Sequence, residues 1–262
     1  MTGTTMAALM AVAEKMAPLK DAESWDNVGL LVGDPDQIIR RVLLTIDHTP
    51  VVQREAEALH CDAVVAYHPP LFSAVKRITA GTVYFDALRK GMAVYCFHTA
   101  LDVAPGGTND VLADVLDLKH RVPLRRPDGA DLQDPRGMGR LGDVTPQTLE
   151  MLAGTLKAAL GLSALLVAGP TARTVQRVAV CAGSCGEFLD DALKANVDVF
   201  VTGELRHHDA LKAATRGLTV VATLHSNSER LVLPRVRDRL MVELPALEVL
   251  LAREDRDPFV VV

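Results

Sequence analysis

The 262-residue sequence has few aromatic residues and no excess of basic charge. Phe, Trp and Tyr together make up 4% of the chain, which leaves few rings on which nucleic-acid bases could stack. The formal net charge is −5 at pH 7, and DNA binding calls for a basic surface. The composition therefore argues against a nucleic-acid partner, and 49% hydrophobic with 23% charged residues is typical of a globular domain.

Long apolar runs are also missing, since none approaches the roughly 18 residues of a membrane span. The N-terminal segment lacks the basic start of a signal peptide, and Glu14 and Lys15 interrupt it. We expect a cytoplasmic protein without a membrane partner, beginning with an amphipathic helix capped by Thr4 or Thr5. Its apolar face is formed by Met6, Leu9, Met10, Ala13 and Met16.

Cysteine is scarce, and no Cys-x-x-Cys occurs. The four residues, Cys61, Cys96, Cys181 and Cys185, predict reduced thiols rather than a disulfide framework. The spacing of Cys181 and Cys185 resembles a metal site only loosely, and core packing beside a glycine turn is the preferred interpretation. That turn could cradle a phosphate, but it matches neither a P-loop nor G-x-G-x-x-G. No G-x-S-x-G elbow supports Ser184 as a nucleophile.

Two segments of the chain share a pattern. Residues 41–66 and 177–202 each read as an apolar strand, a turn, an amphipathic helix, an Asp and a second apolar strand. The similarity resumes at residues 91–95 and 217–221, and each copy then ends in a histidine followed four residues later by an acid. These pairs are His98 with Asp102 and His225 with Glu229. The repeat predicts an internal duplication.

Apolar strands that alternate with helices predict an α/β fold with mixed sheets. We expect two similar α/β lobes. The first comprises residues 1–125 and a returning C-terminal helix within about 228–262, and the second comprises residues 126–227. The Pro- and Gly-containing stretch 121–140 is interpreted as a linker or long surface loop, and a helix is expected near 146–161.

Histidines and carboxylates follow several of the predicted strands. Ligand sites of α/β folds collect at the carboxyl ends of strands. Any one histidine could simply cap a loop or bond a carbonyl, but the set taken together favours a divalent metal site. The spacing does not choose among Zn, Fe, Mn and Ni. The set contains His68, Asp102, His225 and Glu229, and Asp47, His48, Glu204, His207 and His208 also follow strands.

The ordered motifs resemble the Nif-three-like family, also known as GTP cyclohydrolase I type 2. The resemblance extends from about residue 7 to 240. It rests on Trp25-Asp-Asn-Val-Gly29, Tyr67-His-Pro-Pro70, His98-Thr-Ala-Leu-Asp102, Gly106-Gly-Thr-Asn-Asp110, Gly137-Met-Gly-Arg140, Ala179-Val-Cys-Ala-Gly-Ser184, Thr202-Gly-Glu204 and His225-x-x-x-Glu229. It implies a dinuclear metal centre between two lobes, a homohexameric ring, and here no inserted third domain.

The resemblance also implies roles for residues. His68, Asp102, His225 and Glu229 match the family's ligands for up to two divalent ions, with Glu229 bridging. Tyr67 stands where the family often has a second histidine. Because a phenol is a poorer ligand than imidazole unless it is ionised, the second ion is expected to bind more weakly, differently or not at all.

The implied activity is the opening of the imidazole ring of GTP to give dihydroneopterin triphosphate and formate. Water activated by the metal would attack C8 of guanine, and His98 or His208 would move protons. The motifs also fit a second hypothesis for the function, a non-enzymatic hexameric metal-binding scaffold or regulatory interaction protein. An open coordination position facing a pocket would separate the two readings.

Overall fold

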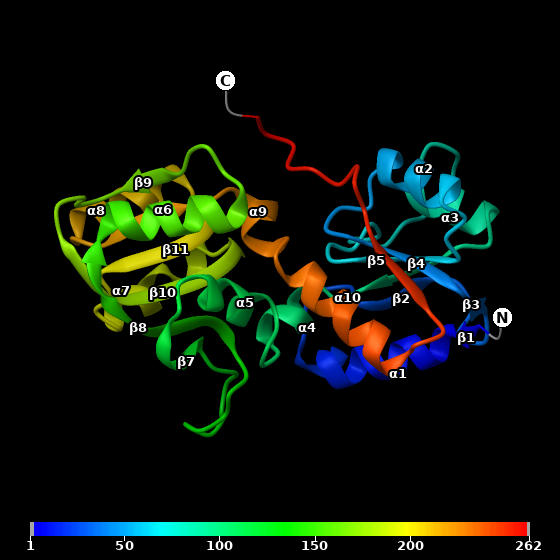
Figure 1. Ribbon diagram of the computed structural model, residues 1–262, viewed down its shortest axis with the longest axis horizontal. Coiled ribbons are helices and arrows are strands. Elements are labelled where there is room, and N and C mark those ends of the chain that lie inside the picture. The colour runs from blue at the N-terminus through cyan, green and yellow to red at the C-terminus, as the bar shows by residue number, and fades with distance from the viewer. Residues whose placement is uncertain (1–2, 261–262) are drawn as a thin grey trace. The chain divides into compact units, whose positions relative to one another are not determined.

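The computed structural model describes residues 3–260, which form two compact units. Residues 3–101 and 232–256 form unit 1, and residues 102–231 and 257–260 form unit 2. Each unit has its own sheet, and helices cover both faces of that sheet (Figure 1). Each unit is therefore an α/β structure with a mixed sheet, as the sequence predicts.

Unit 1 contains a five-stranded sheet of order β13-β4-β5-β6-β2, in which only the edge strand β2 runs antiparallel. The strands are β13 (Glu248–Leu251), β4 (Arg41–Thr45), β5 (Ala63–Ala66), β6 (Ala93–Cys96) and β2 (Gly29–Val32), with a separate pair of β1 (Thr4–Thr5) and β3 (Ile38–Ile39). Helices α1 (Met6–Met16) and α10 (Val232–Glu243) cover one face, and α2 (Pro50–Ala58) and α3 (Val83–Arg89) cover the other (Figure 1). A 3-10 turn spans Leu19–Asp21.

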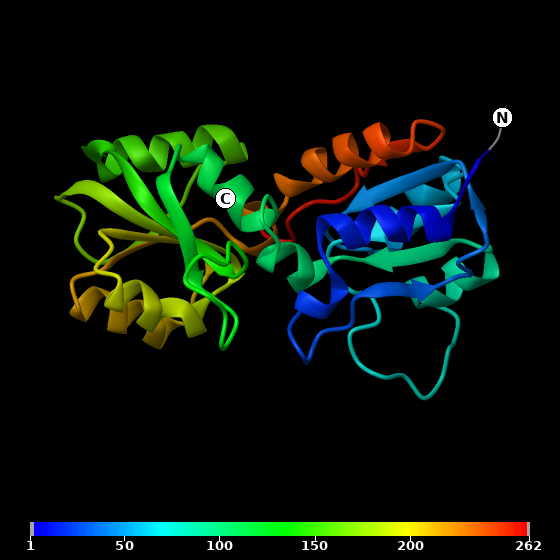
Figure 2. The same ribbon diagram turned by 90° about the horizontal axis from the view of Figure 1, so that it is seen from below.

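Unit 2 contains a six-stranded sheet of order β7-β8-β10-β11-β12-β9. The strands are β7 (Lys119–Arg125), β8 (Met138–Thr148), β10 (Thr174–Ser184), β11 (Val199–Glu204), β12 (Thr219–Ala222) and β9 (Leu166–Ala168). Helices α5 (Thr108–Val115) and α6 (Leu149–Leu160) cover one face (Figure 2). The other face carries α7 (Leu189–Lys194), which follows a 3-10 turn at Gly186–Phe188, and α8 (His207–Thr215).

The two sheets repeat one arrangement. Strands β4, β5 and β6 run parallel in unit 1, as do β10, β11 and β12 in unit 2. The last strand of each triplet, β6 or β12, pairs with an antiparallel strand, β2 or β9. A short helix follows β6 in the chain, and another follows β12. These helices are α4 (His98–Val103) and α9 (His225–Glu229). This is the arrangement that an internal duplication predicts.

Local signals place several elements as the sequence predicts. Helix α1 begins after Thr5, whose Oγ1 accepts a hydrogen bond from the Ala8 amide at 3.2 Å. Helix α6 lies within the range expected near 146–161, and Gly161 ends it in the left-handed conformation. Helix α10 returns from the C-terminal part of the chain and packs against α1 in unit 1.

The division of the chain differs from the predicted one. Residues 102–125 belong to unit 2 and not to the first lobe, and 228–231 also lie in unit 2. The stretch 121–140 is not a linker, because Lys119–Arg125 forms β7 and pairs antiparallel with β8. Proline and glycine there mark the loop between two paired strands. Both ends of that loop lie in one sheet.

Apolar strand residues form the cores. Burial of side chains on both sheet faces explains the near-continuous apolar runs of β4, β5, β10 and β11. One core cluster of unit 2 joins Leu152 and Leu156 of α6 to Val178 and Val180 of β10. Strand ends lie at the rims of these cores, where polar side chains can reach solvent.

No helix among the described residues is both long and apolar enough to cross a bilayer.

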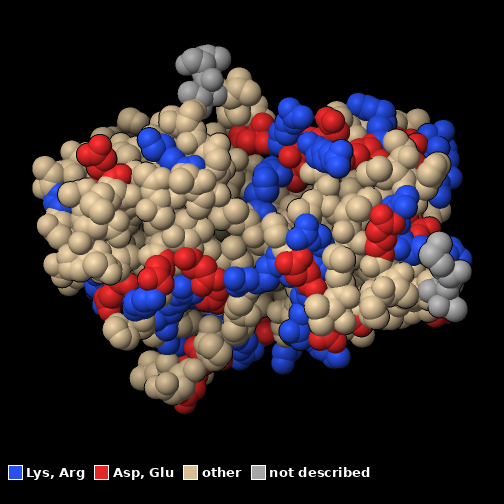
Figure 3. Space-filling view, in the orientation of Figure 1, with Lys and Arg blue, Asp and Glu red and all other residues tan. Residues whose placement is uncertain are grey.

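Helix α6 of unit 2 has only two charged residues, Glu150 and Lys157. The face that bears it shows few charges (Figure 3). Met151 on α6 is 61% exposed and Leu166 on the edge strand β9 is 65% exposed. Unit 2 thus presents apolar side chains to its surroundings.

A buried arginine holds the motifs around Gly106 and Gly137 together in unit 2. Arg140 is only 2% exposed. Its guanidinium donates to the carbonyls of Gly137 and Gly139 at 2.7 Å and to Asp110 Oδ2 at 2.8 Å. The charge is thus paired and its donors are satisfied, which burial of a cation requires.

Replacing Arg140 with Met is expected to lower the free energy of unfolding by about 3 kcal/mol, because the substitution leaves Asp110 charged without its buried partner. Denaturant unfolding measures this loss. Arg177→Met is the control, because its ion pair with Asp143 is exposed and is expected to contribute less than about 1 kcal/mol. Equal losses in the two variants would contradict a structural role for the buried pair.

Candidate metal centre

In unit 1, a histidine and an aspartate meet at the carboxyl ends of two neighbouring strands. Asp47 follows β4 and His68 follows β5, and these strands are parallel partners. Their carboxyl ends therefore lie side by side. Nδ1 of His68 lies 2.9 Å from Oδ1 of Asp47. This contact fixes the orientation of the ring and directs Nε2 away from Asp47.

His98 has the same kind of partner. It begins α4 directly after β6, with a φ of +34°, and its Nδ1 lies 2.7 Å from Oδ1 of Asp26. Oδ2 of Asp26 accepts a hydrogen bond from the Thr99 amide at 3.1 Å. Burial raises the pKa of Asp26, but the hydrogen bonds from His98 and Thr99 outweigh it, so the net pKa is lowered. The carboxylate is thus ionised at neutral pH.

The role of Asp26 has no signal in the sequence. The Trp25 motif predicts a turn with a packed tryptophan, but the Trp25 ring is 55% exposed and meets the edge of His98 at 5.9 Å. Asp26 anchors His98, and the Asn27 side chain donates to the carbonyl of Leu71. Separations of more than 70 residues between Asp26 and its partners leave no local signal for this contact.

Tyr67 is buried beside the two anchored histidines of unit 1. Its ring centroid lies 5.2 Å from that of His68 and 6.0 Å from that of His98, both edge to face. The two imidazole centroids are 5.3 Å apart. The phenol therefore belongs to the same ring cluster as the two imidazoles.

In unit 2, His225 begins α9 after β12, next to the end of β11. Its Nδ1 lies 2.9 Å from Oε1 of Glu204, the last residue of β11, and its Nε2 lies 3.2 Å from Oε1 of Glu229. Glu229 follows one helical turn later and is 3% exposed. The predicted pairing of His225 with Glu229 on one helix face is confirmed, with Glu204 as a carboxylate on the other ring nitrogen.

The glycine turn after β10 fits closely against this pair. Gly183 has a φ of +78°, and a Cβ there would lie 2.7 Å from Oε1 of Glu229 and 3.5 Å from Nε2 of His225. Its amide donates to Oγ of Ser228 at 2.8 Å. The turn thus forms a wall of the His225–Glu229 site. Position 183 requires glycine both for space and for its positive φ.

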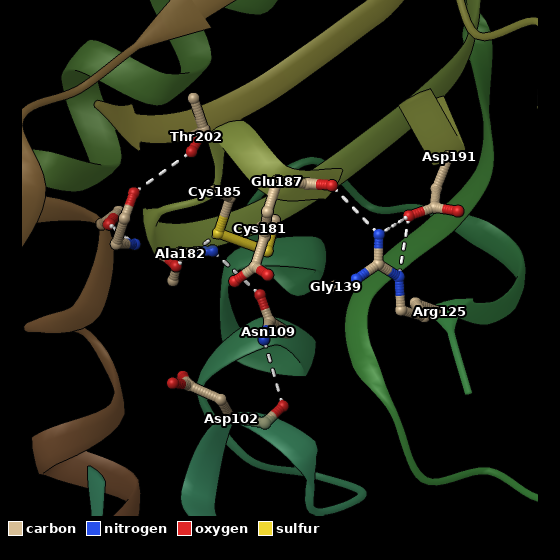
Figure 4. The surroundings of a disulfide bond; sticks show 12 residues. Asp102, Asn109, Arg125, Gly139, Cys181, Ala182, Cys185, Glu187, Asp191 and Thr202 are labelled. Atoms are coloured by element: carbon tan, nitrogen blue, oxygen red, sulfur yellow. Dashed lines mark hydrogen bonds and ion pairs between the residues drawn. A yellow bond between two sulfur atoms is a disulfide. The ribbon is translucent and has the colours of Figure 1, made fainter. Parts of the chain in front are cut away.

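Asn109 connects the same turn to Asp102. Its side-chain Nδ2 donates to the Asp102 carbonyl at 3.0 Å, and its Oδ1 accepts from the Ala182 amide at 2.9 Å (Figure 4). Asp102 is 6% exposed and lies in unit 2, one turn after His98 along α4. The Gly106–Asp110 motif therefore supports a candidate ligand without supplying one.

The prediction of four reduced thiols is wrong for two of them. Cys181 and Cys185 form a disulfide with a Cα–Cα distance of 6.1 Å, and Cys61 and Cys96 are free and buried. The bond occupies both sulfurs, so this pair does not hold zinc in the disulfide form. The spacing of the two cysteines does not reveal the bond, because the bend of the glycine turn brings the two sulfurs together.

His208, the second predicted proton carrier, lies elsewhere in unit 2. It is exposed in the first turn of α8, where its ring meets that of His207 at 5.4 Å. Nearby, Ser184, Glu187, Arg206 and Asp209 line a cavity of about 420 Å³. Of the two predicted proton carriers, only His98 has a carboxylate partner that the structure displays.

One feature unites His68, His98 and His225: a carboxylate holds Nδ1 of each ring at 2.7–2.9 Å. Metal-ligating histidines usually carry such a partner on the second ring nitrogen, which fixes the ring and the tautomer. His120 contacts Asp143 similarly, but both side chains are exposed, that of His120 by 85%. Imidazole and carboxylate donors suit a divalent transition metal.

Known proteins resemble the whole chain. The family model Duf34/NIF3 (NGG1p interacting factor 3) matches residues 4–258. A Clostridium perfringens relative named GTP cyclohydrolase 1 type 2 homolog is 29% identical, covering 96% of this chain and 97% of its own. NGG1-interacting factor 3 of Saccharomyces cerevisiae is 35% identical, covering 94% and 93%.

A solved structure agrees with the fold. A hypothetical protein of Staphylococcus aureus superposes with a TM-score of 0.90 at 27% identity, covering 99% of this chain and 100% of its own. The match therefore includes both sheets and the elements that carry the anchored histidines. With the family model spanning nearly all residues, the resemblance read from the sequence motifs is confirmed: the chain belongs to the Duf34/NIF3 family.

Proposed function

We propose that this protein is a divalent-metal-dependent hydrolase that opens the imidazole ring of GTP and yields dihydroneopterin triphosphate and formate. The observation that carries the proposal is the set of three imidazoles, His68, His98 and His225, each held at Nδ1 by a carboxylate. The choice of reaction is supported by the name GTP cyclohydrolase 1 type 2 homolog, which several relatives bear.

The proposed ligands are imidazoles and carboxylates. His68, His225 and Glu229 each offer one donor atom to a cation, and Asp102 adds a carboxylate. With Glu229 bridging, the set would hold up to two ions per chain. The mixture of imidazole and carboxylate donors fits Zn, Fe, Mn or Ni. Tyr67 in place of a second histidine makes the second ion the weaker one.

A divalent cation bound there would lower the pKa of a coordinated water and make a nucleophile available at neutral pH. His98 is the proposed proton carrier. Because Asp26 is ionised and accepts from Nδ1 of His98, Nε2 is the nitrogen that can take up a proton. Asp26 also stabilises the imidazolium that forms, in the manner of the buried aspartate of a catalytic triad.

The second candidate is a hexameric metal-binding scaffold that contacts other proteins. It is favoured by the weakly charged face of unit 2, where Met151 and Leu166 are exposed. Exposed apolar patches often mark association sites. The yeast relative is named as an interacting factor, which agrees with this alternative. Metal binding without GTP turnover would favour it over the hydrolase.

Metal analysis tests the site first. Wild-type protein is expected to bind up to two equivalents of divalent metal per chain, and about one equivalent would mean that Tyr67 costs the second ion. His225→Ala and Glu229→Ala are expected to lose the bound metal, because each variant removes a donor. Elemental analysis after reconstitution and desalting gives the stoichiometry. His120→Ala is the matched control, since that histidine is exposed and lies outside the donor set. No metal in wild-type protein would refute the site.

The proton-carrier role is separable from ligation. Asp26→Asn and His98→Gln are expected to keep the wild-type metal content and to lower the rate of GTP ring opening about a hundredfold, because general acid–base catalysis contributes that much or more. Formate release and metal analysis give the two readouts. Loss of metal in His98→Gln would instead make His98 a ligand. His208→Gln tests the other predicted proton carrier in the same assays.

The expected assembly is a homohexamer. Size-exclusion chromatography with light scattering should give six times the mass of one chain. Introducing a charge at an exposed apolar position, as in Leu166→Glu, is expected to shift the mass downward if β9 contributes to association. A monomer in wild-type protein at micromolar concentration would contradict the hexamer.

A further inference from the structure

The Cys181–Cys185 disulfide lies within the wall of the His225–Glu229 site. Cys181 lies near the C-terminal end of β10, and Cys185 directly precedes the 3-10 turn at Gly186–Phe188. The bond therefore closes a loop of five residues whose centre is Gly183 (Figure 4). Neither the sequence motifs nor the proposed hydrolysis assigns a role to this bond.

The loop is hydrogen-bonded to the helix that carries the ligands. The Gly183 amide donates to Oγ of Ser228, and Ser228 in turn donates to the His225 carbonyl at 2.7 Å. Ser228 lies between His225 and Glu229 on α9. A shift of the Gly183 peptide is therefore transmitted to α9 through one side chain.

The Gly183 peptide has little room to move while the loop is closed. Its carbonyl accepts from Oγ1 of Thr202 at 3.1 Å, and a Cβ at Gly203 would lie 2.6 Å from that oxygen. On its other side, a Cβ at Gly183 would meet Glu229. Close packing of this kind converts a local covalent change into a displacement of neighbours.

Both redox states of the pair can be accommodated. The Ala182 carbonyl oxygen lies 3.0 Å from Sγ of Cys185, so a Cys185 thiol would find an acceptor in place. The two sulfurs are buried, but the cavity of about 420 Å³ is lined by Ser184 and Gly186, the two chain neighbours of Cys185. A small reductant entering this cavity would reach the residues that flank Cys185.

We propose that the Cys181–Cys185 disulfide is a reversible redox control on cation binding by His225 and Glu229, with a small dithiol as reductant. This inference rests on the proposed metal site. In the exchange, the dithiol's two sulfurs join as a disulfide and supply two electrons, which break the Cys181–Cys185 bond. The two protons released from the dithiol end on the two cysteine sulfurs.

The disulfide form binds the cation more tightly. The closed loop holds the Gly183 amide against Oγ of Ser228 and thus keeps the His225 and Glu229 side chains in their relative positions. Reduction removes the covalent restraint and lets the turn relax. Because losing outer-shell support typically weakens metal binding 10- to 100-fold, the reduced protein is expected to bind about tenfold more weakly.

The experiment compares oxidised and reduced full-length protein, each stripped of metal. The reductant, dithiothreitol, is removed anaerobically before titration. Alkylation after denaturation should label two cysteines in the oxidised form and four in the reduced form. Isothermal titration with Mn²⁺ then gives the affinities, since Mn²⁺ prefers oxygen donors to thiolate. The inference predicts about tenfold weaker binding after reduction.

Other outcomes overturn the inference in distinguishable ways. Equal affinity in both forms, tighter binding after reduction, or four labelled cysteines after mild oxidation would refute redox control and leave the metal site intact. Absence of Mn²⁺ binding in both forms would refute the proposed metal site itself. Because this comparison uses wild-type protein, it does not depend on any variant folding.

Substitutions assign the effect to this pair. The double variant Cys181→Ser with Cys185→Ser is expected to match reduced wild type and to be insensitive to dithiothreitol. Cys61→Ser is the control and should keep the tenfold difference, because burial raises the pKa of that thiol to about 11 and it lies in unit 1. A redox response that persists in the double variant would contradict the assignment.

Discussion

The contact between a carboxylate and Nδ1 of an imidazole organises both halves of this protein. Asp47 and His68 meet because β4 and β5 run parallel and end at the same edge of the sheet. Glu204 and His225 meet for the same reason at β11 and β12. Each contact selects which ring nitrogen faces outward, and with it whether the histidine can ligate a metal or carry a proton.

The sequence motifs mostly build the support for these contacts. Asn109 joins Asp102 to the Ala182 amide, and Ser228 holds the Gly183 turn against α9. Arg140 ties its own glycine-rich segment to Asp110. A site of this kind needs rigid surroundings more than it needs many donors, because misplacement of a ligand or a base by a fraction of an ångström weakens binding and catalysis.

Much of the architecture was predictable because it follows from periodicity. Apolar runs of four to six residues between amphipathic helices identify the parallel strands, and they place His68 and His225 at strand ends. The boundary between units was not predictable in the same way. Strand β7 carries the polar pattern of a loop and becomes a strand only by pairing with β8. Pairing of that kind is a property of the sheet.

The sequence by itself determined the candidate donors, the alternation of strands and helices, and the repeat that places His98 and His225 at equivalent positions. It did so because these features depend on residue type and on spacing along the chain. Only the tertiary structure decided that Asp26 anchors His98, that Trp25 is exposed, and that Cys181 is bonded to Cys185. Such contacts depend on how turns and distant segments bring atoms within about 3 Å, a distance that spacing in the sequence does not encode.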